Sequence, residues 1–123
     1  GYVAVVGASR LSRDFGALVN EVNARQRQPL SFDAAWDRDG HPQNIYCRSD
    51  HYHYARYGIP VVFLFTGLHG DYHQVTDEPQ YINYPNYARI TNYVHDLVLA
   101  AAERPSRFAL SVPKPDPNGT CRQ

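Results

Sequence analysis

The seven residues Ile59–Phe65 form the most hydrophobic run in the chain. Polar and apolar residues do not alternate along it, so a strand at this place must have both of its faces covered. Such strands are typical of the centre of a parallel sheet that is flanked by helices. We therefore predict that Ile59–Phe65 is a central parallel strand of a layered α/β domain.

Two further strands and a helix are predicted before this run. Tyr2–Val6 is short and apolar and ends at a glycine, which indicates a buried strand. A helix is expected from Ser12, a good N-cap, to about Gln26, because apolar residues recur there at helical spacing. Leu30–Trp36 has the pattern of another strand. The apolar helical positions are Phe15, Leu18, Val19 and Val22.

Helices are also predicted on both sides of the apolar run. Ser49 can cap a short helix over Asp50–Tyr57, and Gly58 stands where a left-handed residue ends a helix. A long helix should start after Asn83, with Pro85 in its first turn. Its expected apolar stripe consists of Tyr87, Ile90, Val94, Leu97, Val98 and Ala101.

The order of these elements favours one architecture. Strands and helices alternate, which is typical of a three-layer α/β/α fold with a mostly parallel sheet, here as a partial domain. We assign residues 1–104 to this domain and residues 105–123 to an extended tail, because the tail holds four prolines. The chain has no methionine, and we expect it to be an excerpt or a processed product.

Charge and hydropathy exclude some partners. Twelve basic residues balance twelve acidic residues among 123, so nucleic acid and anionic membranes are poor candidates. No stretch approaches the ~20 apolar residues of a membrane span. Cys47 and Cys121 match no zinc-finger spacing. They could pair in an exported protein, but we expect free thiols, because one lies in a motif and the other in the tail.

Two polar clusters could carry chemistry. Arg48–His51 closes one element and opens a helix, and Asp71–Asp77 lies in the loop after the apolar run, where open α/β sheets place their ligands. Taken alone, each has a structural explanation: Ser-Asp at a helix start is common capping chemistry, and a single loop histidine is usually solvated. Together with their neighbours they form a more specific ordered pattern. In chain order it is Tyr46-Cys47-Arg48-Ser49-Asp50-His51, Ala55, Gly58-Ile59-Pro60, Phe63, Phe65-Thr66-Gly67, Asp71-Tyr72-His73 and Thr76-Asp77.

This pattern resembles the C-terminal half of the co-catalytic zinc exopeptidases that include the bacterial leucyl aminopeptidases and glutamate carboxypeptidase. The resemblance implies two zinc ions in the complete site, with His73 as one ligand and Tyr72 as a hydrogen-bond donor to the tetrahedral oxyanion. It also implies that Ser49 and Asp50 support the ligands from behind. Arg48 orients a substrate carboxylate or is structural, and Asp77 braces the loop.

The same resemblance implies that most of the site lies elsewhere. A catalytic zinc needs about three protein ligands, and the chain supplies one for a two-metal site. The remaining ligands and the general base would come from a missing N-terminal half of the same domain, so the isolated chain is expected to be inactive. The complete protein would be a secreted or periplasmic aminopeptidase that hydrolyses peptide substrates at a free N-terminus through a metal-bound hydroxide. A non-catalytic receptor-like ectodomain and a glutaminyl cyclase remain alternatives.

Overall fold

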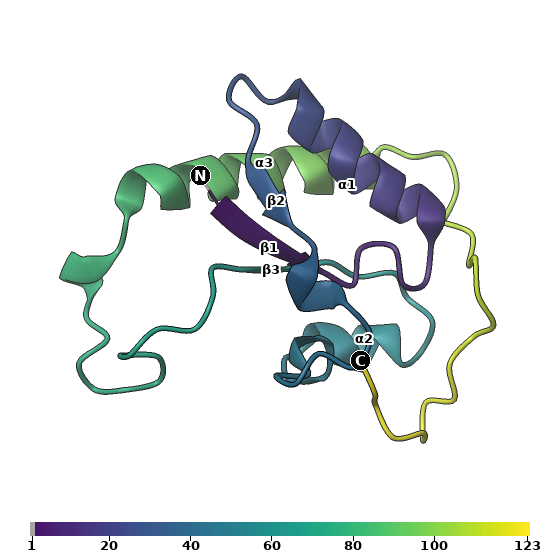
Figure 1. Ribbon diagram of the computed structural model, residues 1–123. Coiled ribbons are helices and arrows are strands. Elements are labelled where there is room, and N and C mark those ends of the chain that lie inside the picture. The colour runs from purple at the N-terminus through teal and green to yellow at the C-terminus, as the bar shows by residue number, and fades with distance from the viewer. Residues whose placement is uncertain (1) are drawn as a thin grey trace.

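The computed structural model describes residues 2–123, which form three strands, three α-helices and three short 3₁₀ helices (Figure 1). The strands are β1 (Tyr2–Val6), β2 (Ser31–Asp33) and β3 (Phe63–Phe65). The α-helices are α1 (Arg13–Arg25), α2 (His51–Ala55) and α3 (Tyr84–Ala102). The 3₁₀ helices are η1 (Ala35–Asp37), η2 (Ile45–Cys47) and η3 (Pro79–Tyr81).

The sheet is mixed and has the strand order β2-β1-β3. β1 pairs with β2 in parallel, and with β3 in antiparallel orientation, with Val6 opposite Phe63. The prediction that the run Ile59–Phe65 is a central parallel strand is therefore wrong. β1 takes the centre because all four residues from Val3 to Val6 are buried, whereas Phe63 and Leu64 are only half-buried. Among residues 2–123 no strand pairs with the other edge of β3.

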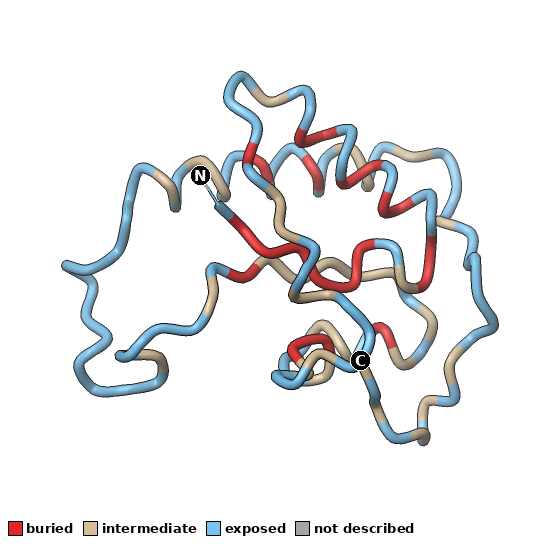
Figure 2. The backbone as a smooth tube through the Cα atoms, viewed as in Figure 1, coloured by how far each residue is buried: buried red, intermediate tan, exposed pale blue. Residues whose placement is uncertain are grey.

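Helices cover both faces of the sheet, which confirms the α/β class. Val3 and Val5 point into a core formed with α1 and α3, whereas Ala4 and Val6 point into a second core with η2 and α2. Figure 1 shows α1 and α3 on one side of β1 and α2 on the other. The buried positions gather along β1 and on the inner sides of the helices (Figure 2).

Helix α1 follows the sequence prediction closely. The fully buried Ser12 is its N-cap, and its Oγ accepts a hydrogen bond from the Phe15 amide at 3.3 Å. Near the other end, Asn23 forms two hydrogen bonds with the backbone of Leu30: its Nδ2 donates to the carbonyl oxygen at 2.9 Å, and its Oδ1 accepts from the amide at 2.8 Å. The side chain of Asn23 therefore sets the path from α1 into β2.

Helix α3 begins after Asn83, as predicted, and buries only part of the predicted stripe, namely Leu97 with the partly buried Ile90 and Ala101. Tyr93 and Leu97 are buried, whereas Tyr87 and Val98 are each 61% exposed. The predicted stripe is wrong by part of a turn because it omits Tyr93. This ring packs edge-on against Phe32 with centroids 5.5 Å apart, and so fixes the rotation of the helix.

Helix α2 is shorter than predicted. It spans His51–Ala55, its N-cap is Asp50, and no side-chain capping bond forms, so the capping role expected of Ser49 is wrong. Ser49 contributes its backbone carbonyl instead, which accepts from the Tyr52 amide at 3.1 Å. Gly58 has φ +80°, as expected of the residue that ends this helix.

Residues 105–123 have no helix or strand, but they pack along the domain. Phe108 meets Phe15 edge-on at 5.0 Å between centroids, and the Ser111 amide donates to the Leu11 carbonyl at 2.8 Å. Cys121 forms a disulfide with Cys47, with the two Cα atoms 5.9 Å apart. The expectation of free thiols is therefore wrong, because the tail returns to the segment that carries Cys47. None of the helices in the described part of the chain is both long and apolar enough to cross a membrane.

Candidate functional site

The loop between β3 and α3 is held by its own hydrogen bonds. The Tyr72 amide donates to the His69 carbonyl at 3.1 Å, and the Gln74 amide donates to the Asp71 carbonyl at 2.8 Å. The Thr76 hydroxyl donates to Oδ1 of Asp71 at 2.6 Å. The loop is thus a chain of turns with a defined shape, although most of its side chains are exposed.

Tyr72 and His73 form a stacked pair at the tip of these turns. Their ring centroids lie 4.0 Å apart, with an angle of 15° between the planes. Tyr72 is half-buried and packs edge-on against Phe65 at 6.5 Å, whereas His73 is exposed. His73 also has φ +59°, a left-handed conformation that is uncommon outside glycine. The arrangement presents an accessible imidazole beside an anchored phenol.

A groove of about 570 Å³ lies between this loop and the first turns of α3. Its volume is in the range of small-molecule sites. Three carboxylates line it, those of Asp71, Asp77 and Glu78, and Nε2 of His69 lies 3.8 Å from Oδ2 of Asp77. Asp77 therefore has a partner within the loop, in agreement with a bracing role. The other lining residues include Tyr81, Ile82, Asn86, Tyr87 and Ile90.

The first motif, Arg48–His51, runs from the end of η2 to the first residue of α2. Nη1 of Arg48 donates to the backbone carbonyl and to Oε1 of Gln43, at 3.3 and 3.2 Å. The side chains of Ser49 and Asp50 are exposed. In the described part of the chain, no hydrogen bond joins Arg48, Ser49 or Asp50 to Tyr72 or His73. Their roles in the site therefore stay predictions.

His51 links the two motifs through aromatic contacts that the sequence analysis missed. Its ring stacks on Phe63 at 4.7 Å, with an interplanar angle of 16°, and Phe63 in turn stacks on Phe65 at 5.9 Å. Since Phe65 contacts Tyr72, the side chains of β3 connect His51 to the Tyr72–His73 pair. Burial lowers the pKa of His51 below its ordinary value of 6.5.

The described residues do not form a metal site by themselves. Across residues 2–123 no group of three His, Cys, Asp or Glu side chains lies close enough to hold a metal ion. A zinc site needs about three protein ligands, and the exposed ring of His73 could supply one of them. The donor set in this chain therefore fits a part of a zinc site, and not a whole one.

Comparison with protein families identifies the class. The model of Peptidase family M28 matches residues 9–98, a range that holds both motifs, β3 and most of α3. The match covers most of the chain, so the chain belongs to peptidase family M28, whose members are zinc-dependent peptidases. Comparisons with curated proteins and with solved structures gave no significant match. The prediction of a zinc peptidase family is confirmed at this level, and peptides are the implied substrates.

Proposed function

We propose that this chain is the C-terminal part of the catalytic domain of a zinc aminopeptidase of the bacterial leucyl aminopeptidase and glutamate carboxypeptidase group. The complete protein hydrolyses the peptide bond that follows a free N-terminal residue. The observation that carries the proposal is the family match across both motifs, together with the Tyr72–His73 pair on the loop after β3.

His73 and Tyr72 have separate roles in this scheme. His73 is the metal ligand, because its ring is exposed and its conformation is set by the turns of the loop. When bound, zinc supplies a Lewis acid and makes a nucleophile from water at neutral pH. Tyr72 donates its phenol proton in a hydrogen bond to the oxygen that gains negative charge during hydrolysis. Its packing against Phe65 supports this role, because a fixed donor needs no reorganisation during the reaction.

The other ligands and the general base come from a segment outside this chain. The open edge of β3 supports this part of the proposal, since an unpaired edge is a template for a further strand. Ser49 and Asp50 support the ligands, and Arg48 orients the substrate. The isolated chain lacks the ligand set and is therefore inactive.

The disulfide between Cys47 and Cys121 supports a secreted or periplasmic location. Disulfides persist in oxidising compartments and are rare in the reducing cytosol.

Zinc titration of the protein with the sequence that precedes Gly1 in its gene tests the proposal. The wild type should bind two zinc ions, and His73→Ala should lose one. His53→Ala is the matched control, because His53 is an exposed histidine on α2. Equal zinc stoichiometry in the wild type and His73→Ala would remove His73 from the site.

Activity assays test the reaction. The wild type should hydrolyse a leucine anilide with a free amino group and leave its N-acetylated form intact. Tyr72→Phe should lower kcat by about 10²-fold, the usual size of the loss of one oxyanion donor. Cyclisation of N-terminal glutamine would favour the glutaminyl cyclase instead, and zinc-free binding of peptides would favour the receptor-like ectodomain.

A further inference from the structure

Residues 105–123, called here the 105–123 strap, lie outside the family match and have specific anchors along the domain. The Arg104 guanidinium lies over the Phe108 ring at 4.3 Å, and the Arg13 amide donates to Oγ of Ser111 at 2.9 Å. Arg56 donates to the carbonyl of Pro117. The strap therefore contacts the domain along much of its length and ends beside the disulfide.

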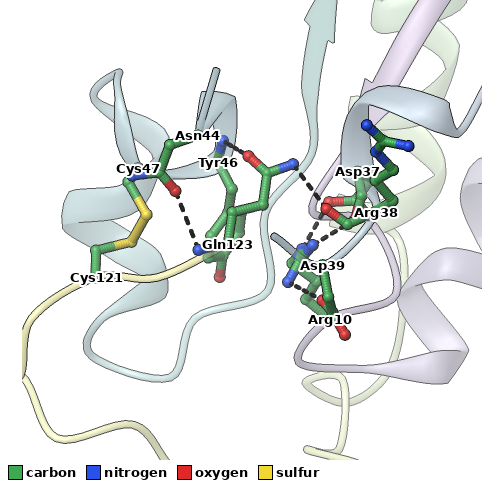
Figure 3. Close-up of a disulfide and its surroundings, with 9 residues drawn as sticks. All are labelled: Arg10, Asp37, Arg38, Asp39, Asn44, Tyr46, Cys47, Cys121 and Gln123. Atoms are coloured by element: carbon green, nitrogen blue, oxygen red, sulfur yellow. Dashed lines mark hydrogen bonds and ion pairs between the residues drawn. A yellow bond between two sulfur atoms is a disulfide. The ribbon is translucent and has the colours of Figure 1, made fainter. Parts of the chain in front are cut away.

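Gln123 forms several hydrogen bonds with the domain, and Figure 3 shows those with Asn44, Tyr46 and Arg38. Its amide donates to Oδ1 of Asn44 at 3.0 Å, and its Oε1 accepts from the Tyr46 amide at 2.9 Å. Its carbonyl accepts from the Gly40 amide at 2.7 Å, and its Nε2 donates to the carbonyl of Trp36. One side chain and its backbone thus hold the polar loop 36–46 in place.

Trp36 connects this loop to the candidate site. Its indole packs edge-on against Phe65 at 5.2 Å, and Phe65 packs edge-on against Tyr72 at 6.5 Å. Trp36, Tyr72, Cys47 and Cys121 all pack against the same buried core as Phe65. A continuous series of contacts therefore leads from Gln123 through Trp36 and Phe65 to the Tyr72–His73 pair.

We propose that the 105–123 strap positions the Tyr72–His73 pair, with Gln123 as its positioning residue. Interiors are close-packed, so a shift of Trp36 leaves a void against Phe65 and loosens the packing of the Tyr72 ring, which also contacts Phe65. Catalytic groups that move by about 1 Å lose much of their effect, so loss of the strap slows the reaction without removing a ligand. The effect on the reaction rests on the proposed function, whereas the effect on the loop does not.

Hydrogen exchange measured by mass spectrometry tests the effect on the loop. The amides of Tyr72, Gln74 and Asp77 are hydrogen-bonded and therefore protected in the native loop. Gln123→Ala should speed their exchange about tenfold relative to the amides of α1. Gln123→Glu should do the same, because it keeps the acceptor for Tyr46 but loses the donor to Trp36.

Two controls make the result decisive. Asn118→Ala changes an exposed side chain of the strap and should leave the exchange unchanged. The sole tryptophan, Trp36, should shift its emission to the red in both Gln123 variants. Unchanged exchange in the loop, or equal acceleration in the loop and α1, would overturn the positioning role.

Kinetics separate this inference from the proposed function. In the protein that carries the preceding segment, Gln123→Glu should lower kcat about tenfold, with KM and zinc stoichiometry unchanged. If the wild type shows no zinc-dependent hydrolysis, the proposed function fails and the exchange result still decides the role of the strap. If hydrolysis is present and kcat is unchanged in Gln123→Glu, the strap has no part in positioning the pair.

Discussion

The phenol oxygen of Tyr93 donates a hydrogen bond to the carbonyl oxygen of Val19, 3.0 Å away, in the interface between α3 and α1. Both residues are almost completely buried. The Tyr93 ring also contacts Phe32 of β2, so this side chain joins two helices and the sheet. Burial raises the pKa of the Tyr93 phenol well above its ordinary value of 10.0, and the hydroxyl keeps its proton.

Removal of this hydroxyl should destabilise the domain. Tyr93→Phe keeps the ring but loses the hydrogen bond, and we expect a decrease of about 1 kcal/mol in the free energy of unfolding. Urea denaturation followed by circular dichroism measures the change. Tyr87→Phe is the matched control on the same helix, because Tyr87 is exposed, and its midpoint should stay at the wild-type value. Equal midpoints for both variants would contradict the role of the bond.

His51 should make the stability depend on pH on the acid side. Burial lowers its pKa in the folded chain, so below about pH 6.5 the unfolded chain binds more protons. The contribution of neutral His51 to the free energy of unfolding is therefore complete above that pH. It is lost as the pH falls through the pKa that His51 has in the folded state. Urea midpoints between about pH 5 and about pH 8 should therefore rise with pH. The dependence should weaken in His51→Phe and persist in His53→Gln, which alters an exposed histidine of the same helix.

Gly16→Ala should destabilise α1 although alanine is the better helix former. A Cβ at this position would lie 2.9 Å from Cβ of Ser9 and 3.1 Å from its Cα, so the backbone of Ser9 must shift. We expect Gly16→Ala to lower the free energy of unfolding by about 1 kcal/mol or more. The same substitution at an unhindered helix position would raise it by about 1 kcal/mol. The double variant with Ser9→Gly should recover part of the loss in the same denaturation assay. A Gly16→Ala variant that is more stable than the wild type would contradict the prediction, because it would show that the backbone of Ser9 can shift at little cost in free energy.

Loss of the disulfide should destabilise the whole domain. The bond joins residues separated by 74 positions, and a cross-link of this length restricts the unfolded chain strongly. Cys47→Ala combined with Cys121→Ala should lower the free energy of unfolding by about 2–4 kcal/mol. Thermal unfolding with and without a thiol reductant measures the effect. The reductant should lower the Tm of the wild type and leave that of the double variant unchanged; a wild type indifferent to reductant would argue against the cross-link.

Much of the fold could be predicted because its signals are local. Ser12 caps α1 as expected, and the apolar run at Tyr2–Val6 is a buried strand. The strength of an apolar run gives neither the direction nor the neighbours of a strand, so the antiparallel edge position of β3 and the exposure of Ile59 could not be derived from Ile59–Phe65. The pairing of Cys47 with Cys121 depends on the path of 19 residues of irregular tail, which has no periodicity to read.

In the candidate site, too, local signals could be predicted from the sequence, whereas contacts between distant residues could not. Tyr72 and His73 could be found because they are neighbours in sequence within an ordered motif, and the structure stacks them. The contacts of His51 with Phe63, and of Trp36 with Phe65, join residues far apart in the chain. They depend on how the layers pack, and nothing in the spacing of these residues indicates them.

The disulfide also changes what a protease can do to this protein. Residues 47–121 form one closed covalent ring, which holds β3, the loop after it and α3. Val75 is 97% exposed in that loop and offers a cutting site, but one cut there opens the ring and leaves both pieces joined through sulfur. A nicked sample would run as a single species until thiol is added, so the backbone beside His73 can be broken while the two halves of the ring stay together.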